Sequence, residues 1–216
     1  MRDQIIQKVY GKKIIAIVRG VYGEDCLNLA KALYAGGIEM MEVTFDQSHP
    51  ENLDRTSDSV HTVKETMGDK MILGAGTVTS IEMVKLARDA GAQFIVSPDT
   101  NEDVIKATRN NDMVSMPGAM TPTEILTAYR YGADFVKVFP TSNLGAAYIK
   151  AIRGPINHIP LLAVGGVNEK NIGEFLKAGV VGAGVGGNLV NKSWIAEGCF
   201  DKITALAREF VENTSV

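Results

Sequence analysis

Cysteine and histidine are scarce in this sequence of 216 residues, which contains two of the former and three of the latter. Cys26 and Cys199 lie far apart, and neither belongs to a CxxC pair or to a cysteine–histidine spacing. The histidines form no HxH or HExxH motif. Zinc sites and disulfide frameworks depend on such spacings, so we expect reduced, structural thiols and no metal. The chemistry is therefore expected to run on side chains alone, with no cofactor.

A long apolar run and an excess of basic charge are also absent. No stretch reaches the roughly 20 apolar residues that cross a bilayer, and residues 1–13 lack the apolar segment of a signal peptide. The net charge is −3, and lysine and arginine are scattered along the chain. These features predict no membrane association, no nucleic-acid partner and a cytoplasmic location.

What the sequence does contain is one repeated pattern: a short, nearly all-apolar run, a turn, and a longer amphipathic stretch. Runs that are apolar throughout are buried on both faces, as in a parallel sheet that helices cover. Eight such runs are predicted to be strands: about 14–18, 38–45, 71–76, 93–97, 113–117, 134–140, 159–166 and 180–186. Residues that favour helix starts precede four of the intervening stretches: Ser80, Asn101, Thr121 and Asn168.

Eight strand–helix units of roughly 20 to 25 residues match a closed barrel better than an open, doubly wound sheet of five or six strands. No linker or low-complexity segment divides the chain. We therefore expect residues 1–216 to form a single (β/α)8 TIM barrel of the α/β class, with a short helix before the first strand. In such barrels the active site lies at the carboxyl ends of the strands.

Two charged residues lie inside apolar runs, where burial is costly. In DFVKVFP, burial of Lys137 would lower its pKa, and a neutral amine can form an imine with a ketone. The alternatives are a lysine that reaches solvent or one paired with a carboxylate. In MMEVTF, Glu42 can move protons, or it can form a structural ion pair with Lys137 or Arg19.

Further polar residues and glycines follow other predicted strands. Arg19 ends the run IAIVRG and is suited to bind a substrate carboxylate, unless it is only a solvated strand end. Thr77 in GAGTV offers a hydroxyl to a ligand or to Glu42. The segments AVGGVN and GVGGN follow the last two strands, where barrels commonly bind phosphate through backbone N–H groups, although tight turns alone would also require glycine. Together these groups indicate imine chemistry on a phosphorylated keto acid.

The ordered motifs now identify a resemblance that covers essentially the whole chain. IAIVRG, AGGIEMMEVTF, GAGTVTS, AGAQFIVSP, MPGAMTPTE, FVKVFP and AVGGVN resemble the bacterial KHG/KDPG aldolases. The resemblance implies a lyase, a class I aldolase that cleaves 2-keto-3-deoxy-6-phosphogluconate to pyruvate and D-glyceraldehyde 3-phosphate through a Schiff base. It also implies a small-molecule keto-deoxy sugar acid phosphate as partner and a homotrimer.

The family's functional residues fall on matching positions of this chain. The Schiff-base lysine falls on Lys137 and the proton-transfer glutamate on Glu42. The predicted substrate-binding residues are Arg19, Thr77 and Pro140, and the predicted phosphate-binding residues are Gly165, Gly166, Gly186 and Gly187.

Three departures from the gluconate-type pattern put the substrate's stereochemistry in doubt. Asp46 stands where many such members have an arginine that binds the carboxylate, which leaves that role to Arg19. Val164 stands where many have a threonine, and AVGG resembles the galactonate branch. Gly187 stands where many have a serine. Aldolases for 2-keto-3-deoxy-6-phosphogalactonate or 4-hydroxy-2-oxoglutarate are therefore alternatives.

Two further readings use the same glycine loops without imine chemistry. One is a metal-free barrel isomerase or synthase for phosphorylated sugars or heterocycles, which needs no lysine at the barrel mouth. The other is a non-catalytic paralogue that only binds sugar phosphates. The presence of both Lys137 and Glu42 argues against the second.

Overall fold

The all-apolar runs of the sequence form parallel strands in the computed structural model, which describes residues 2–48 and 51–215. The nine strands are β1 (Ile14–Val18), β2 (Met40–Thr44), β3 (Ile72–Gly76), β4 (Phe94–Val96), β5 (Val114–Met116), β6 (Gly118–Ala119), β7 (Val136–Val138), β8 (Leu161–Val164) and β9 (Gly182–Val185). They form one sheet in the order β5-β4-β3-β2-β1-β9-β8-β7-β6, and every pairing is parallel. The predicted strands are thus confirmed in order and direction, although most are shorter than expected.

The ninth strand arises because Pro117 divides the predicted run 113–117 from the two residues after it. β5 pairs with β4, while β6 pairs with β7, so the two ends of the sheet meet at one continuous stretch of chain. Proline has no N–H to donate to a ladder, and here the pairing changes from one neighbour to the other. The carbonyl of Pro117 still accepts from Lys137 N at 2.9 Å. The expected eight-position α/β barrel is therefore present and nearly closed.

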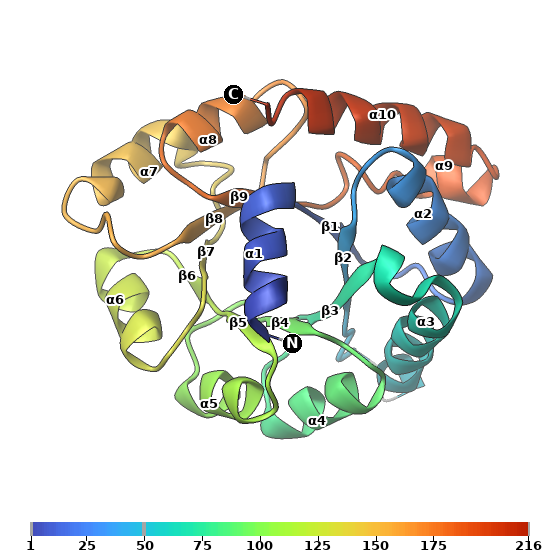
Figure 1. The fold of residues 1–216 in the computed structure, drawn as a ribbon, viewed down its shortest axis with the longest axis horizontal. Helices are drawn as coiled ribbons and strands as arrows, with labels where there is room; N and C mark the ends of the chain where they lie inside the picture. The colour runs from blue at the N-terminus through green and yellow to red at the C-terminus, as the bar shows by residue number, and fades with distance from the viewer. Residues whose placement is uncertain (1, 49–50, 216) are drawn as a thin grey trace.

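Helices surround the strands as an outer ring in Figure 1, apart from the first one, which lies over the centre of the barrel. They are α1 (Arg2–Lys12), α2 (Gly23–Ala35), α3 (Glu51–Met67), the 3-10 helix η1 (Gly68–Lys70), α4 (Ile81–Asp89), α5 (Glu102–Asn110), α6 (Pro122–Arg130), α7 (Gly145–Arg153), α8 (Ile172–Lys177), α9 (Lys192–Ala196) and α10 (Phe200–Glu212). None of the helices within residues 2–48 and 51–215 is long and apolar enough to cross a membrane.

Side-chain caps confirm three of the four predicted helix starts. Ser80 and Asn101 accept hydrogen bonds from the first turns of α4 and α5, and Thr121 forms a capping box with Glu124 at α6. The prediction at Asn168 is wrong. Its side chain accepts from the N–H groups two and three residues later, which makes a turn, and α8 begins only at Ile172. Asn168 therefore stabilises a turn that precedes α8 and does not cap the helix itself.

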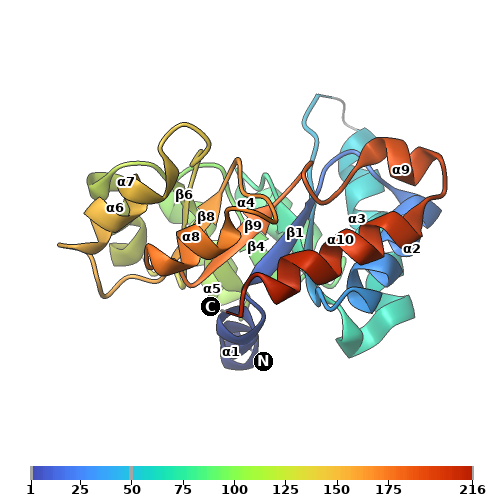
Figure 2. The same cartoon turned by 90° about the horizontal axis from the view of Figure 1, so that it is seen from above.

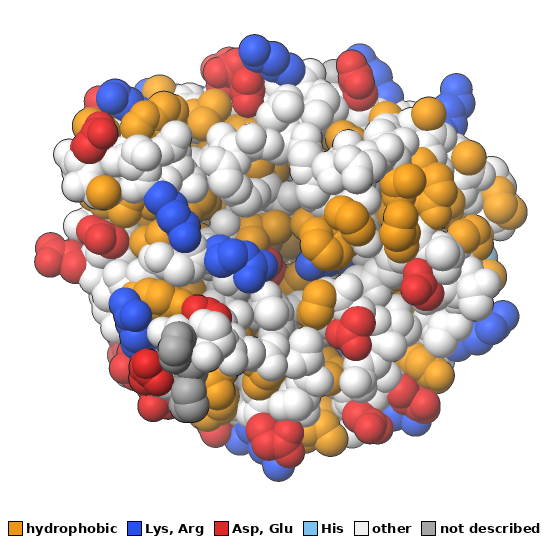
Figure 3. Space-filling view, turned by 180° about the vertical axis from the view of Figure 1, so that it is seen from behind, with side chains coloured by type: hydrophobic (Ala, Val, Ile, Leu, Met, Phe, Trp, Pro, Cys, Tyr) orange, Lys and Arg blue, Asp and Glu red, His pale blue; other side chains and the backbone are white. Residues whose placement is uncertain are grey.

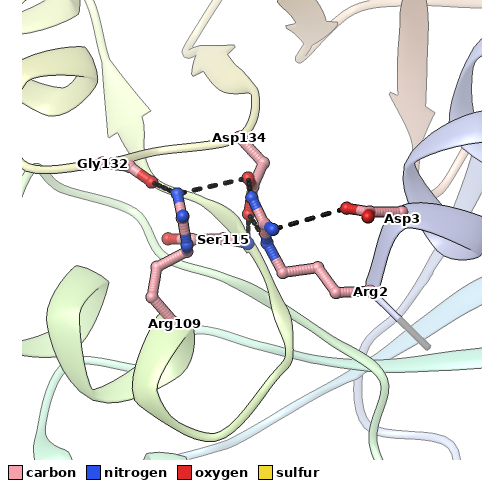
Figure 4. Close-up of polar contacts among 6 residues, drawn as sticks. All are labelled: Arg2, Asp3, Arg109, Ser115, Gly132 and Asp134. Carbon is pink, nitrogen blue, oxygen red and sulfur yellow. Dashed lines mark hydrogen bonds and ion pairs between the residues drawn. The ribbon is translucent and has the colours of Figure 1, made fainter.

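The predicted N-terminal helix, α1, lies across the amino-terminal opening of the barrel (Figures 1 and 2). Its Ile5 and Val9 join a buried cluster with side chains from the barrel interior, among them Phe94 and Phe135. Arg2 is bonded through its guanidinium to both carboxylate oxygens of Asp134, just before β7 (Figure 4). This end of the barrel is therefore closed by apolar packing and by an ion pair.

Candidate active site

Lys137 lies in the middle of β7, with Gly118 and Leu162 as its register neighbours. Only 8% of its surface is exposed. Burial lowers the pKa of its ammonium, and the Arg19 cation lowers it further, whereas Glu42 raises it. The Nζ atom lies 4.5 Å from the centre of the Phe139 ring. A lysine in this position is a nucleophile that loses its proton more readily than a solvated lysine does.

Glu42 lies in β2 and is 2% exposed. Burial raises the pKa of its carboxyl to about 7, although Lys137 and Arg19 both act to lower it. The carboxylate lies over Gly76, where an added Cβ would come within 2.7 Å of Oε1. The glycine of GAGTV is therefore required to make room for this group. A carboxyl with a pKa near neutrality can both accept and donate a proton.

Glu42 and Lys137 line the same small cavity inside the barrel. The other lining residues are apolar or glycine: Ile15, Ile17, Val96, Met116, Leu162, Val164 and Gly184. Among the residues that the structure describes, Glu42 and Lys137 influence each other's charge but form no ion pair within 4 Å, and Oε2 of Glu42 has no hydrogen-bond partner. The alternative of a purely structural ion pair is therefore not supported. The cavity holds two ionisable groups that are available to a ligand.

Arg19 and Thr77 meet at the mouth above this cavity. Nη2 of Arg19 lies 3.5 Å from Oγ1 of Thr77. Thr77 has a φ of 58°, a left-handed conformation that is costly for a β-branched residue. Gln47 also reaches this corner, because its Nε2 lies 3.1 Å from Thr79 Oγ1 and 3.5 Å from the carbonyl of Thr77. Asp46 instead accepts hydrogen bonds from Asn52 and from Ser48 N–H.

All four predicted phosphate-binding glycines line a second cavity of about 270 Å³. Its complete lining is Ile17, Phe139, Val164, Gly165, Gly166, Val167, Gly184, Gly186, Gly187 and Asn188. Gly166 has a φ of 74°, and an added Cβ would lie 2.8 Å from the Cα of Ser142. No other residue type fits at this position. Exposed backbone amides in such loops are the usual donors to a bound anion.

Side chains hold the two glycine loops in place. Asn171 Nδ2 donates to the carbonyl of Gly166 at 3.0 Å, and Asn188 Nδ2 donates to the carbonyl of Val167 at 2.8 Å. Pro140 lies beside Gly165, where an added Cβ would be 3.4 Å from its ring. Pro140 is not among the residues that line these two cavities.

The two cavities share Ile17, Val164 and Gly184, so they adjoin. Together they extend from the buried amine to the glycine loops at the carboxyl ends of the strands. Figure 3 shows this face, where a hollow with basic side-chain atoms at its edge opens near the centre. Sequence reasoning did not assign a role to Phe139 or Asn188. Both directly adjoin predicted site residues, which is the signal that could have identified them.

The arrangement suits attack on a ketone by an amine, followed by proton transfers to and from a carboxyl of matched pKa. A group of three or more histidine, cysteine, aspartate or glutamate side chains that could bind a metal is not found in the described ranges. The cavity at Lys137 and the adjoining glycine-lined cavity also separate the reacting end of a ligand from an anionic end.

Known proteins resemble the chain over nearly its whole length. The pattern of the KDPG and KHG aldolase family matches residues 5–206. The 2-dehydro-3-deoxy-6-phosphogalactonate aldolase of Escherichia coli K12 is 32% identical over 92% of this chain and 95% of its own. The 2-dehydro-3-deoxy-phosphogluconate aldolase of Treponema pallidum is 33% identical over 94% of both chains.

Solved structures agree with the sequence matches. The native KDPGal structure has a TM-score of 0.83 at 32% identity and covers 93% of each chain. KDPG aldolase from Legionella pneumophila, with pyruvate captured as a covalent carbinolamine, has a TM-score of 0.83 at 28% identity and covers 94% of this chain and 96% of its own.

Proposed function

The chain belongs to the KDPG and KHG aldolase family, and from this premise we propose that it cleaves 2-keto-3-deoxy-6-phosphogluconate to pyruvate and D-glyceraldehyde 3-phosphate. The coarser assignment needs no proposal: the chain is a lyase, a class I aldolase that forms pyruvate. The competing assignments as an isomerase or as a non-catalytic binding protein do not agree with this family.

One observation carries the proposal most directly: Lys137 and Glu42 line one cavity, and that cavity adjoins a second one lined by the glycine loops. A keto acid whose C2 lies at Lys137 could extend its phosphorylated end into the second cavity. An unphosphorylated substrate such as 4-hydroxy-2-oxoglutarate would leave that cavity unused. At the mouth, Arg19 with Thr77 supplies a cation and a hydroxyl for the carboxylate.

The proposed reaction begins when neutral Lys137 attacks the C2 ketone. Glu42 supplies the proton that carries water away from the carbinolamine, which leaves a protonated imine. The imine withdraws electrons from the C3–C4 bond, which breaks as the C4 hydroxyl gives its proton to the Glu42 carboxylate. Glyceraldehyde 3-phosphate departs, and Glu42 returns the proton to C3 of the enamine, directly or through a water. Water then adds to the imine while Glu42 takes one of its protons, so hydrolysis releases pyruvate and restores both the amine and the protonated carboxyl.

The galactonate epimer is a second candidate, and Val164 is the observation that favours it. This side chain lies where the two cavities adjoin, next to the expected position of C4. A valine there offers no hydrogen bond to a hydroxyl, whereas the threonine of many gluconate-type members would. The use of Arg19 in place of an arginine at position 46 points in the same direction.

The experiment compares pyruvate release from four purified substrates: the two C4 epimers of the phosphorylated acid, an unphosphorylated 2-keto-3-deoxy sugar acid and 4-hydroxy-2-oxoglutarate. We expect kcat/KM to be at least about tenfold higher for a phosphorylated substrate, because charged hydrogen bonds to the phosphate are lost without it. A Val164→Thr variant should move the epimer preference toward the gluconate. Equal rates with and without phosphate would contradict the proposal.

The family resemblance also leads us to propose a homotrimer. Light scattering on the purified chain would test this directly, with a mass of three chains expected and a monomeric mass as the contrary result.

A further inference from the structure

Two buried polar atoms on β2 have no hydrogen-bond partner. They are Oε2 of Glu42 and Oγ1 of Thr44. Within the described part of the chain, only Tyr22 and Ser57 also have a buried side-chain oxygen without a hydrogen-bond partner. Thr44 is 1% exposed. Buried polar groups in proteins nearly always bond to protein, ligand or water. Two such atoms, two residues apart on one strand of the active site, therefore point to a shared partner.

The alternation of β2 places both side chains inside the barrel. Met40 belongs to the buried cluster of the barrel interior, whereas Met41 and Val43 belong to the cluster between strands and helices. Because side chains alternate along a strand, Glu42 and Thr44 share the inner face with Met40.

The Glu42 carboxylate also extends to the level of Thr44. The register partner of Thr44 on β3 is Gly76, and the carboxylate lies over this same glycine, 2.7 Å from where its Cβ would be. Neighbouring strands are about 4.8 Å apart. A water that forms one hydrogen bond of about 2.8 Å to each of two groups can bridge such a gap. One water can therefore bond both to the hydroxyl of Thr44 and to the Glu42 carboxylate.

We propose that Thr44 is a positioning residue whose hydroxyl holds a water against the Glu42 carboxylate, and that this water carries protons between Glu42 and the methyl carbon of the pyruvate imine on Lys137. The inference rests on the proposed function, because it assigns a part to that same site. Glu42 provides the link to the imine, because it lines the same small cavity as Lys137, whereas Thr44 is not among the residues that line this cavity.

The proton transfer is balanced. In the direction of enamine formation, the water takes a proton from the imine methyl group while it gives one of its own protons to the Glu42 carboxylate. The C–H electrons form the C=C bond, and the C=N electrons move onto the nitrogen of Lys137. The water is regenerated, and the reverse path protonates the enamine.

The test measures exchange of the methyl hydrogens of pyruvate for deuterium in D2O by proton NMR, which needs no choice of sugar substrate. Thr44→Val keeps the shape and removes the hydroxyl, Thr44→Ala removes it independently, and Thr44→Ser restores it. Thr108→Val is the matched control, because Thr108 is equally buried but its hydroxyl donates to the carbonyl of Val104 in α5.

We expect Thr44→Val and Thr44→Ala to exchange about tenfold more slowly, with the half-saturating pyruvate concentration changed less than about twofold. The acid limb of their rate–pH profile should move to higher pH, because a lost donor destabilises the ionised carboxylate. Thr44→Ser should recover most of the rate and the wild-type limb, and Thr108→Val should leave both unchanged.

The outcomes separate this inference from the function on which it rests. Wild-type rates and an unmoved acid limb in both hydroxyl-free variants, with exchange by the wild-type chain intact, would overturn the role of Thr44 and leave the aldolase assignment standing. A Thr44→Ser variant as slow as Thr44→Val, with the fold retained by circular dichroism, would also overturn it. No exchange and no borohydride-trapped pyruvate in the wild-type chain would instead overturn the proposed function.

Discussion

The two ends of the barrel differ in whether their buried carboxylates are fully hydrogen-bonded. At the amino-terminal end, Asp134 is 4% exposed in its side chain and is fully partnered: it bonds Arg2 and Arg109 and accepts from Ser115 N–H at 2.9 Å (Figure 4). At the carboxyl-terminal end, Glu42 is equally buried but has an oxygen without a partner. Breaking a paired buried charge costs stability, whereas an unpaired one is available to react.

The difference follows from what each end must do. α1 covers the amino-terminal end, and the ion pair of Arg2 with Asp134 ties its first turn to the base of β7. Lys137 follows three residues later, in the middle of β7, and lines the cavity inside the barrel. One short stretch of chain thus combines an anchor with a reactive group. Removing a charge at the amino-terminal end should therefore lower stability, and removing one at the carboxyl-terminal end should lower turnover.

The largest effect is expected at Lys137. Lys137→Ala removes the imine nucleophile, so pyruvate release should fall below detection, by at least about 10⁴-fold, while the fold is retained. Lys150→Ala, on α7, is the control and should keep wild-type turnover. Steady-state assays on both variants check this. Measurable wild-type-like turnover in Lys137→Ala would show that catalysis does not pass through this amine.

A smaller effect is expected at Glu42. Glu42→Gln keeps the shape but cannot accept a proton, so kcat should fall by about 10²–10⁴-fold. In the wild-type chain, retro-aldol activity should fall on both sides of the Glu42 pKa of about 7, because dehydration of the carbinolamine needs the acid and cleavage needs the carboxylate. A rate that is flat from pH 5 to pH 9 would contradict this role.

The same substitution should stabilise the protein above neutrality. The pKa of Glu42 is raised from 4.5 to about 7, so the folded state binds more protons than the unfolded state between these values. Its contribution to stability therefore decreases as pH rises through that window, by up to about 3 kcal/mol. Urea unfolding at pH 4 and pH 8 should show Glu42→Gln gaining on the wild-type chain at the higher pH. An unchanged difference between the two would contradict the raised pKa.

A further prediction concerns Arg19, at the mouth of the carboxyl-terminal end, and its binding of the substrate carboxylate. Arg19→Ala should raise KM by about 10- to 100-fold, because a charged hydrogen bond to the substrate carboxylate is lost, and kcat should fall less. Arg130→Ala at the end of α6 is a control that should leave both constants unchanged. A KM of Arg19→Ala that matches the wild type would assign the carboxylate to another group.

The smallest effect on turnover is expected at the amino-terminal end. Asp134→Ala should lower the free energy of unfolding by about 2–4 kcal/mol, since it leaves the Ser115 N–H without its partner and Arg2 with only the exposed Asp3. Asp89→Ala at the exposed pair with Arg88 should cost about 0–1 kcal/mol. The kcat of folded Asp134→Ala should stay within about twofold of the wild type. A loss of turnover without a loss of stability would reverse the comparison.

The parts of this account that the sequence could predict are those that break a local pattern. Lys137 and Glu42 are charges inside apolar runs, and the glycines after β8 and β9 follow runs that end where barrels bind phosphate. The strand order followed from the repeat. These signals are local in the chain, so no three-dimensional information was needed to find them.

The remaining features depend on contacts between distant segments. Arg2 and Asp134 are 132 residues apart, and nothing in either neighbourhood predicts their pairing. Gln47 is one polar residue among many in its loop, and its contact with Thr79 appears only once β2 and β3 lie side by side. The unpartnered hydroxyl of Thr44 follows from the position of the Glu42 carboxylate over Gly76, which depends on strand register.

The central claim is that the unpaired amine at the carboxyl-terminal end forms the imine. The most direct measurement is the intact mass of the wild-type chain after treatment with pyruvate and sodium borohydride, followed by peptide mapping. The account predicts one pyruvate-derived adduct per chain, located on Lys137 and absent from Lys137→Ala. An adduct on a different lysine, or no adduct on folded protein with pyruvate in excess, would contradict it.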